Sequence, residues 1–164
     1  MDRRTFIKLA AGGTGILLLP GFGLPAYAAQ RIEKITRSNA EWKTLLTPEQ
    51  YNVLREDGTE YAYTSPLNNE MRSGMFACIA CEFPLFLSKF KFDSGTGWPS
   101  FFDVLPGHVE TRKDVELLIP RTEYHCARCG GHHGHVFEDG PKPTGLRYCN
   151  NGVALRFIPG QGQS

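Results

Sequence analysis

The spacing of apolar and polar positions changes along the chain, from helix-like before residue 58 to strand-like after residue 74. Two segments place a hydroxyl residue three positions before Glu or Gln, namely Ser38 with Glu41 and Thr47 with Gln50. This is the capping-box pattern of a helix N-terminus, and the proline at position 48 suits a first helical turn. We therefore expect two short helices, the second running from about residue 48 to 57 and ending at Gly58.

From Gly74 onward, short apolar or alternating runs are separated by Gly, Pro, Asn and Asp, which is typical of strands joined by turns. The 18 glycines and 11 prolines of the chain favour the same interpretation. We expect strands near residues 75–78, 89–92, 115–120, 123–126, 134–137, 147–149 and 153–158. The pattern predicts a mainly β domain with antiparallel sheets.

The first residues have the pattern of an export signal. Adjacent arginines at positions 3 and 4 precede an apolar run over residues 9–19, which resembles a twin-arginine signal. This run is shorter than the roughly 20 residues that span a bilayer, and small residues at 26–28 suit a signal peptidase. We expect a cleaved signal over 1–28, a linker over 29–37, a folded domain over 38–164, and a periplasmic or otherwise extracytoplasmic location. A retained N-terminal anchor is the alternative.

Charge and length narrow the classes of partner. The chain has 164 residues, with 18 basic and 17 acidic side chains and a formal net charge of +1. No long run of one sign is present, so nucleic acid is not an expected partner. Without its signal, the chain has the length of one ordinary domain, and we expect a monomer.

Four of the five cysteines form two C-x-x-C pairs, Cys78 with Cys81 and Cys126 with Cys129. Together they can provide a tetrahedral four-sulfur site for one structural zinc ion, although residues 82–125 make the separation longer than in common zinc ribbons. Disulfides and a redox-active C-x-x-C are the alternatives. We favour zinc, because a disulfide within either pair closes only a tiny loop, and no βαβ pattern surrounds either pair.

Cys149 is the unpaired cysteine and a candidate reactive thiol. Arg147 is two residues away on an expected strand, so both side chains would lie on one face, where a cation favours the thiolate. A buried structural cysteine is the alternative.

Two further segments contain side chains suited to chemistry beside a thiol. His132 and His135 follow the second cysteine pair and can exchange protons near neutral pH. They could instead bind metal, although four thiolates already complete a tetrahedron. Trp98 lies in a glycine-flanked turn; alone it would more often be a core residue, but its indole could bind a methyl group attached to sulfur.

These segments together resemble the B-type methionine sulfoxide reductase family. The resemblance rests on residues 94–101, residues 131–137, Arg147-Tyr148-Cys149 followed by Asn151, and the two C-x-x-C pairs, and it covers about residues 41–159. It implies a compact domain of two antiparallel sheets with short helices at its start. It also implies thiol-dependent reduction of methionine-R-sulfoxide in oxidised proteins, a repair reaction under oxidative stress.

The resemblance implies a role for each site residue. Cys149 would be the nucleophile that becomes a sulfenic acid, His132 and His135 the catalytic histidines, Trp98 the methyl-binding residue, and Arg147 and Asn151 substrate-binding residues. A proton must reach the sulfoxide oxygen during the reaction, and the histidines would transfer it.

The sequence departs from part of the family at Thr96, where many members have a resolving cysteine. Threonine cannot form an internal disulfide, so an external dithiol of thioredoxin type, or a small thiol, would have to reduce the sulfenic acid. We favour the dithiol. At Asn150 and Gly152 the family often has other residues; Asn151-Gly152 suits a type I′ hairpin, which would re-aim Asn151. We expect His133 to be an exposed or packing residue.

Two other functions remain to be considered at this point. One is a non-catalytic, zinc-stapled binding module in which Cys149 is incidental. The other is a cysteine hydrolase that uses Cys149 with one histidine, which would need an oxyanion hole that the sequence does not indicate. A binding module has no need for a thiol, two histidines and an indole together, so we favour the reductase.

Overall fold

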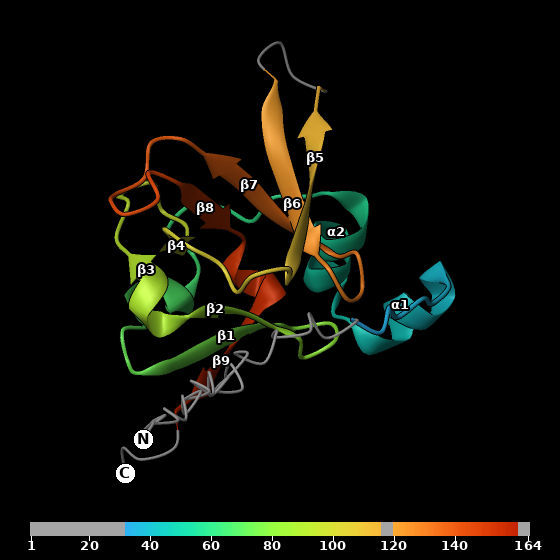
Figure 1. Ribbon diagram of the computed structural model, residues 1–164. Helices are drawn as coiled ribbons and strands as arrows, with labels where there is room; N and C mark the ends of the chain where they lie inside the picture. The colour runs from blue at the N-terminus through green and yellow to red at the C-terminus, as the bar shows by residue number, and fades with distance from the viewer. Residues whose placement is uncertain (1–31, 116–119, 161–164) are drawn as a thin grey trace, which may run out of the picture. The chain divides into compact units, whose positions relative to one another are not determined.

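The structure is a computed structural model that describes residues 32–115 and 120–160, which belong to one folded unit (Figure 1). The expected signal over residues 1–28 lies outside the described residues. Within the described part of the chain, no helix combines the length and the apolar character needed to cross a bilayer.

Two short helices precede nine strands in the described residues, with three short 3-10 turns between them. The elements are α1 Asn39–Leu45, α2 Pro48–Glu56, η1 Pro66–Asn69, β1 Gly74–Cys78, β2 Pro84–Leu87, η2 Ser88–Phe90, β3 Lys91–Phe92, β4 Ser100–Phe101, β5 Val109–Asp114, β6 Arg121–Cys126, β7 His132–Phe137, β8 Arg147–Asn150, η3 Gly152–Ala154 and β9 Leu155–Pro159.

Both helices begin at the expected capping boxes. The side chains of Ser38 and Thr47 accept hydrogen bonds from the backbone N–H groups three residues later, and the reciprocal bonds are present as well. The second helix ends one residue earlier than expected. Asp57 itself adopts the left-handed conformation, with φ of 55°, so the expectation of a glycine cap at Gly58 was wrong.

The strands form two antiparallel sheets, which confirms the predicted fold class. One sheet has the order β2-β1-β9 and the other β3-β4-β8-β7-β6-β5. Buried aromatic rings from both sheets pack together: Phe76 of β1 lies 5.0 Å from Phe101 of β4, and Phe86 of β2 stacks on Phe101 at 4.2 Å between ring centroids. In Figure 1 strands β5 and β6 lie side by side at one edge of the larger sheet.

The strands that were expected from apolar patterning are largely present. Four expected segments, 75–78, 123–126, 134–137 and 147–149, lie within β1, β6, β7 and β8. Two were wrong in part, because 89–92 begins as η2 and 153–158 begins as η3. Most of the expected strand 115–120 falls on residues 116–119, outside the described residues, and Val115 and Pro120 are not in a strand.

Strands β2, β4 and β5 were not anticipated. β5 has the sequence VETRKD and contains no fully buried residue, because it forms the outer edge of its sheet and lacks apolar alternation. β2 begins with proline, which is tolerated because β2 is also an edge strand. β4 has only two residues, too few for a periodic pattern.

Candidate active site and metal centre

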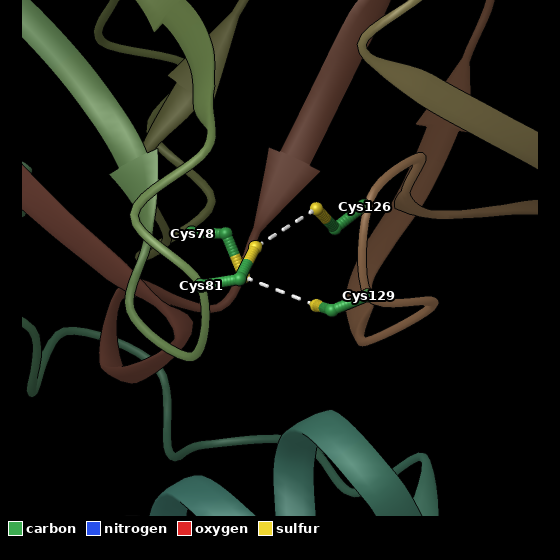
Figure 2. A group of neighbouring side chains, drawn as sticks. All are labelled: Cys78, Cys81, Cys126 and Cys129. Carbon is green, nitrogen blue, oxygen red and sulfur yellow. Dashed lines mark hydrogen bonds between the residues drawn. The ribbon is translucent and has the colours of Figure 1, made fainter. Parts of the chain in front are cut away.

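The four cysteines of the two C-x-x-C pairs come together in one cluster (Figure 2). Their sulfur atoms all lie within 4.8 Å of one another. The Sγ atoms of Cys78 and Cys129 are 3.7 Å apart, and those of Cys81 and Cys126 are 3.6 Å apart. Sulfurs around a tetrahedral zinc ion, with bonds of about 2.3 Å, are separated by about 3.8 Å, so these residues fit the ion. All four thiols are free.

The cluster joins the two sheets. Cys78 ends β1 of the smaller sheet, and Cys81 lies in the turn that follows it. Cys126 ends β6 of the larger sheet, and Cys129 lies in the turn between β6 and β7. A bound cation would therefore connect two sheets whose ligands are far apart in the sequence, which closes a long loop.

Crowding makes the cluster a poor place for four separate thiolates. Hydrogen bonds from the neighbouring thiols, Cys126 first, and burial raise the pKa of Cys78 well above its usual range. Hydrogen bonds from the three other thiols, Cys126 first, lower the pKa of Cys129. Four thiolates can share so small a volume only around a cation, whose charge stabilises all of them.

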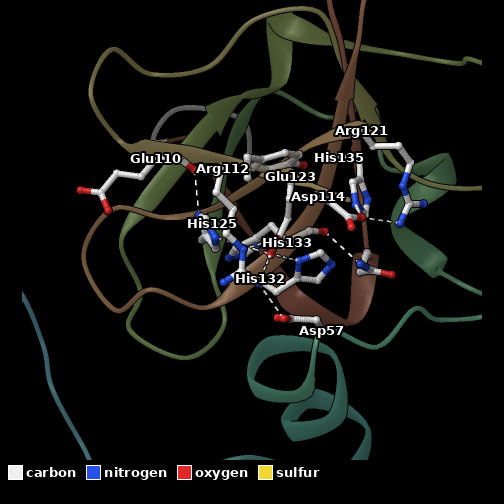
Figure 3. Close-up of polar contacts among 12 residues, drawn as sticks. Asp57, Glu110, Arg112, Asp114, Arg121, Glu123, His125, His132, His133 and His135 are labelled. Carbon is white, nitrogen blue, oxygen red and sulfur yellow. Dashed lines mark hydrogen bonds and ion pairs between the residues drawn. The ribbon is translucent and has the colours of Figure 1, made fainter. Parts of the chain in front are cut away.

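A second group of possible metal ligands already binds a positively charged side chain. Asp57, Glu123 and His132 bring ligand atoms within 4.8 Å of one another. The Arg112 guanidinium lies between the two carboxylates: Nη2 is 2.7 Å from Asp57 Oδ2, and Nε donates to Glu123 (Figure 3). The guanidinium supplies the positive charge, so we do not assign a metal to this group.

The larger sheet aligns polar residues in one row across its strands. Cys149 of β8 lies directly opposite Ser100 of β4 on one side and His135 of β7 on the other. His135 is opposite Glu123 of β6, and Glu123 is opposite Arg112 of β5. Directly opposite residues of antiparallel strands project from the same face. Strand pairing alone therefore gathers a thiol, an imidazole, a carboxylate and a guanidinium.

His132 joins this face because β7 contains one additional residue. His132 pairs with His125 of β6, and Gly134 pairs with the preceding residue of β6, Tyr124. His133 lies between these two pairs and has no partner in β6, so it is the additional residue. A bulge of this kind shifts the alternation of faces by one residue. The rings of His132 and His135, three positions apart in sequence, consequently lie 5.6 Å apart between centroids.

Gly134 allows the close approach of β7 and β8. Its φ is +152°, and a Cβ atom at this position would lie 2.0 Å from the carbonyl oxygen of Cys149. A side chain here would push away the strand that carries Cys149.

A small cavity of about 140 Å³ opens beside Cys149. It is lined by Thr59, Trp98, Arg121, His135, Phe137, Cys149, Asn150 and Asn151. Four of the six expected active-site residues are therefore together. His132 instead lines an adjoining cavity of about 410 Å³, which shares Thr59, Arg121 and His135 with the first. Arg147 lines neither cavity.

The electrostatics of Cys149 differ from the expectation. Burial raises the pKa of its thiol, while the charge of Arg147 and hydrogen bonds from Thr96 and Arg147 act in the opposite direction. The expected effect of Arg147 is present, but burial outweighs it. The guanidinium is also bound to Asp139 through two contacts of 2.8 Å and lies over the Phe137 ring. Arg147 thus acts on the sulfur of Cys149 from outside the cavity.

Each histidine of the pair is bound to a carboxylate (Figure 3). His132 Nδ1 lies 2.6 Å from Glu123 Oε1, and His135 Nε2 lies 2.8 Å from Asp114 Oδ2. Because a carboxylate only accepts, each of these ring nitrogens carries a proton. In His132 the opposite ring nitrogen, Nε2, is buried and has no hydrogen-bond partner.

His135 is neutral at neutral pH. Burial lowers its pKa, although the hydrogen bond to Asp114 acts in the opposite direction. A neutral ring can take up a proton at its free nitrogen and release it again, as acid–base chemistry requires.

Trp98 stands at the edge of the cavity, half-buried, and does not belong to the core. Its indole Nε1 donates to the backbone oxygen of Glu60 at 3.1 Å. The buried Glu60 carboxylate accepts hydrogen bonds from the backbone N–H groups of Gly152 and Val153. Its own backbone N–H donates to Asn151 Oδ1 at 3.0 Å. Glu60 therefore links the indole to the segment after Cys149.

Asn151 is buried, and its amide is held by the backbone. Besides the bond from Glu60, its Nδ2 donates to the carbonyl of His133 at 3.0 Å. The suggested type I′ hairpin was wrong: Asn151 has φ of −66°, and Gly152 begins the 3-10 turn η3. Gly152 is required for another reason, since a Cβ atom there would lie 1.9 Å from Ser65 Oγ.

His133 is a packing residue and fully buried. Its Nδ1 lies 3.4 Å from Asn150 Oδ1, and its ring stacks near Tyr124. Burial lowers the pKa of His133 to about 4, so the ring is neutral in the folded protein.

Sequence reasoning missed the charged partners of the histidines. Asp114 and Glu123 lie in β5 and β6 among other charged residues, where the pattern indicates only solvated strand faces. Arg121, which lines the cavity and lies 2.6 Å from Asp114, was missed for the same reason. The signal that could have found them is strand register, which places them beside β7.

Comparison with known proteins gives a consistent result. Residues 46–159 match the SelR domain family. "Peptide methionine sulfoxide reductase MsrB" of Agrobacterium fabrum is 54% identical over 127 residues, which cover 77% of this chain and 94% of that protein. The protein of the same name from Methanosarcina mazei is 51% identical over 125 residues, covering 76% and 89%. That from Pseudomonas putida is 50% identical over 133 residues, covering 80% and 99%.

Proposed function

The chain belongs to the SelR-domain family of MsrB peptide methionine sulfoxide reductases, and we propose that Cys149 is the nucleophile of its reaction. The protein is an oxidoreductase that reduces methionine-R-sulfoxide in peptides and proteins, and so repairs oxidised proteins. The observation that carries the proposal is the position of Cys149 beside Trp98, His135 and Asn151 in one cavity.

In the proposed reaction, the methyl group of the substrate rests on the Trp98 indole, and its sulfur faces Cys149. The Cys149 sulfur attacks the sulfoxide sulfur while His135 delivers a proton to the sulfoxide oxygen. The sulfur–oxygen bond of the substrate then breaks, and the protonated oxygen leaves as hydroxide while the two sulfurs are bonded to each other. Hydroxide attacks the Cys149 sulfur, the sulfur–sulfur bond breaks to release methionine, and Cys149 remains as a sulfenic acid. Methionine is reduced by two electrons, and Cys149 is oxidised by two.

Cys149 must then be reduced from outside. Threonine occupies position 96, and the other four cysteines lie together in the cluster proposed to bind a metal. We propose that a dithiol protein of thioredoxin type attacks the sulfenic acid, releases water and forms a mixed disulfide, which its second thiol breaks. Trapping with dimedone after one turnover should label Cys149 stoichiometrically. An internal disulfide from Cys149 would refute this route.

We propose that the four-cysteine cluster holds one structural zinc ion. Cys78, Cys81, Cys126 and Cys129 would fill its tetrahedron with thiolates, leaving no open position for substrate. The ion would supply a cross-link between the sheets. The separations of 3.6 and 3.7 Å between the sulfurs support this assignment.

The proposed location and assembly rest on the sequence. We propose export by the twin-arginine route, cleavage after residue 28, a linker over 29–37 and a domain over 38–164, supported by the paired arginines and the apolar run. Replacing both arginines by lysine should keep the protein in the cytoplasm with residues 1–28 attached. The monomer remains a prediction, which light scattering of the purified protein tests.

One assay tests the reductase chemistry. The mature protein and Cys149→Ser are incubated with each epimer of methionine sulfoxide and dithiothreitol, and methionine is measured. We expect activity on the R epimer in the natural protein only. Equal activity in Cys149→Ser would refute the nucleophile, and activity on the S epimer alone would refute the substrate.

A further inference from the structure

Trp98 is shared by two neighbouring cavities. It lines the cavity of about 140 Å³ beside Cys149, and it also lines a cavity of about 460 Å³. This second cavity, which we call the flanking cavity, is lined by Tyr63, Met71 and Lys91 as well. The proposed reaction uses none of these three residues and gives the flanking cavity no ligand.

The cavity beside Cys149 has room for the end of one side chain. A cavity of about 150 Å³ holds one benzene-sized group, and this one has about 140 Å³. The protein acts on methionine-R-sulfoxide in peptides and proteins, so the polypeptide on either side of the oxidised residue must lie outside this cavity. It must continue over surface that adjoins the cavity, and the flanking cavity adjoins it at Trp98.

The flanking cavity presents large hydrophobic residues to solvent. Tyr63 is 73% exposed and Met71 is 66% exposed. Tyrosine provides a large contact area at low cost in conformational entropy, and methionine adapts its shape to varied partners. A protein that repairs oxidised methionines in many different sequences needs a surface of this tolerant kind.

The fold fixes the Tyr63 ring without burying it. The backbone of Tyr63 is left-handed, with φ of 66°, which is unfavourable for a bulky side chain. Its N–H donates to the Gly97 oxygen at 2.7 Å, and its phenol donates to the Gly95 oxygen at 2.8 Å. A Cβ atom on Gly97 would lie 2.9 Å from two ring carbons, so the ring rests on the turn that leads into Trp98. A ring that is already in position binds a ligand at a lower entropic cost.

Polar contacts of Lys91 join Met71 to the same turn. The Lys91 ammonium donates to the backbone oxygen of Asn68 at 2.7 Å and lies 3.7 Å from Met71 Sδ. Asn68 Nδ2 in turn donates to the Gly97 oxygen at 3.0 Å. Both exposed hydrophobic residues of the flanking cavity are therefore connected to the turn that positions Trp98.

The other cavity that adjoins the site, of about 410 Å³, offers a different surface. Its charged side chains pair with one another, Arg112 with Asp57 at 2.7 Å and Arg121 with Asp114 at 2.6 Å. A polypeptide that covered these ion pairs would remove them from water without supplying a fixed charge in return. In the flanking cavity Lys91 is already buried, so covering it costs less.

We propose that the flanking cavity binds the polypeptide next to the oxidised methionine, with the Tyr63 ring and the Met71 side chain in contact with a neighbouring residue of the substrate. This inference deepens the proposed function and rests on the proposed placement of the substrate methyl group on Trp98. Tyr63 and Met71 thereby determine how well a substrate protein binds and take no part in the chemistry at sulfur.

Two substrates separate binding of the flanking polypeptide from the reaction. N-acetyl-methionine-R-sulfoxide has no neighbouring residue, whereas a short peptide carries methionine-R-sulfoxide between two leucines. kcat/KM is measured for both with dithiothreitol as reductant. In Tyr63→Asn the ring is lost, but asparagine tolerates the left-handed conformation. We expect kcat/KM for the peptide, relative to that for the N-acetyl compound, to fall about tenfold through a higher KM.

Met71→Ser supplies a second variant, in which the same ratio should fall about threefold, since a flexible side chain loses more entropy on binding than a fixed ring. Tyr61→Asn is the matched control. Tyr61 belongs to the same segment and is 88% exposed, but it lines neither cavity, so its substitution should leave the ratio unchanged. Melting temperatures establish that each variant is folded, and Met71→Ser decides the outcome if Tyr63→Asn does not fold.

An unchanged ratio in folded Tyr63→Asn would overturn the proposal. Equal losses on both substrates would also overturn it, because Tyr63 would then affect the reaction itself and not the flanking polypeptide. The ratio compares two substrates of the same protein, so it does not depend on which residue is the nucleophile. Failure of the proposed function would appear instead as full activity of Cys149→Ser on both substrates.

Discussion

The five cysteines occupy two regions that surround the same side chain in opposite ways. In the cluster, each sulfur is surrounded mainly by three other sulfurs, at the point where the two sheets meet. Cys149 lies outside that cluster, and its cavity is lined by Trp98, His135 and Asn151. The comparison teaches that the neighbours, and not the residue type, decide whether a cysteine is suited to hold a metal or to take part in a reaction.

The two regions also differ in what their surroundings leave free. The cluster positions suit a fully coordinated ion, so they contribute to stability. Beside Cys149 a cavity remains open, and each nearby histidine uses only one ring nitrogen for its carboxylate. We therefore expect substitutions in the first region to change folding, and substitutions in the second to change reaction rate.

The largest expected effect comes from breaking the cluster. Cys126→Ser should lose the metal and with it roughly 10 kcal/mol of stabilisation, which is the order measured for structural zinc sites and is enough to unfold a domain. Metal content and thermal unfolding by circular dichroism measure this. Cys149→Ser is the matched control and should keep both the metal and the melting temperature. If Cys126→Ser kept its metal and its melting temperature, the cluster would not have the stabilising role that distinguishes it from the region around Cys149.

A smaller effect is expected at the histidines. His135→Asn should lower kcat/KM for methionine-R-sulfoxide by about 10²–10⁴-fold, because it removes the proposed proton donor, which lines the cavity beside Cys149. His132→Asn should lose less, since His132 lies in the adjoining cavity. The melting temperatures of both variants serve as controls for folding. A greater loss in His132→Asn than in His135→Asn would reverse the assignment.

His133 should make the stability of the domain depend on pH. The unfolded chain takes up a proton at His133 below its ordinary pKa of 6.5, whereas the folded protein does so only near its lowered pKa of about 4. Stability should therefore fall as the pH drops from 6.5 to 4, by up to about 3 kcal/mol, and this contribution should be constant above 6.5.

Urea unfolding at several pH values measures this dependence. His133→Gln supplies the comparison, because glutamine cannot be protonated and the acid loss of the metal cluster is common to both proteins. The difference between the two curves should grow only within the stated window. If the unfolding free energies of the two proteins changed in parallel from pH 7 to pH 4, His133 would not contribute to the pH dependence of stability.

The smallest expected effect is at Glu60. Glu60→Gln keeps the shape of the side chain but replaces the charged acceptor for the N–H groups of Gly152 and Val153, at a cost of about 1–2 kcal/mol. Because Glu60 also links Trp98 to Asn151, we expect a several-fold rise in KM with a smaller change in kcat. Tryptophan fluorescence and steady-state kinetics measure these effects. A change in kcat alone would contradict this positioning role.

Several features of this protein follow from the sequence alone. The capping boxes at Ser38 and Thr47 fixed where both helices begin, because each box is a local pattern within four residues. The two C-x-x-C pairs identified the cluster, and the segments around Trp98, His132 and Cys149 identified the family. Local patterns determine these features because the groups that interact, or the motif that is matched, lie close together in the chain.

Only the tertiary structure decided which groups surround Cys149. The row of Ser100, Cys149, His135 and Glu123 crosses four strands, and its alignment depends on register and on the additional residue in β7. A shift of one residue in any pairing would turn these side chains to the opposite face. Edge strand β5, which supplies Asp114 to His135, has no apolar pattern to reveal it. Contacts between distant strands are set by packing and pairing energies that no short segment of the sequence contains.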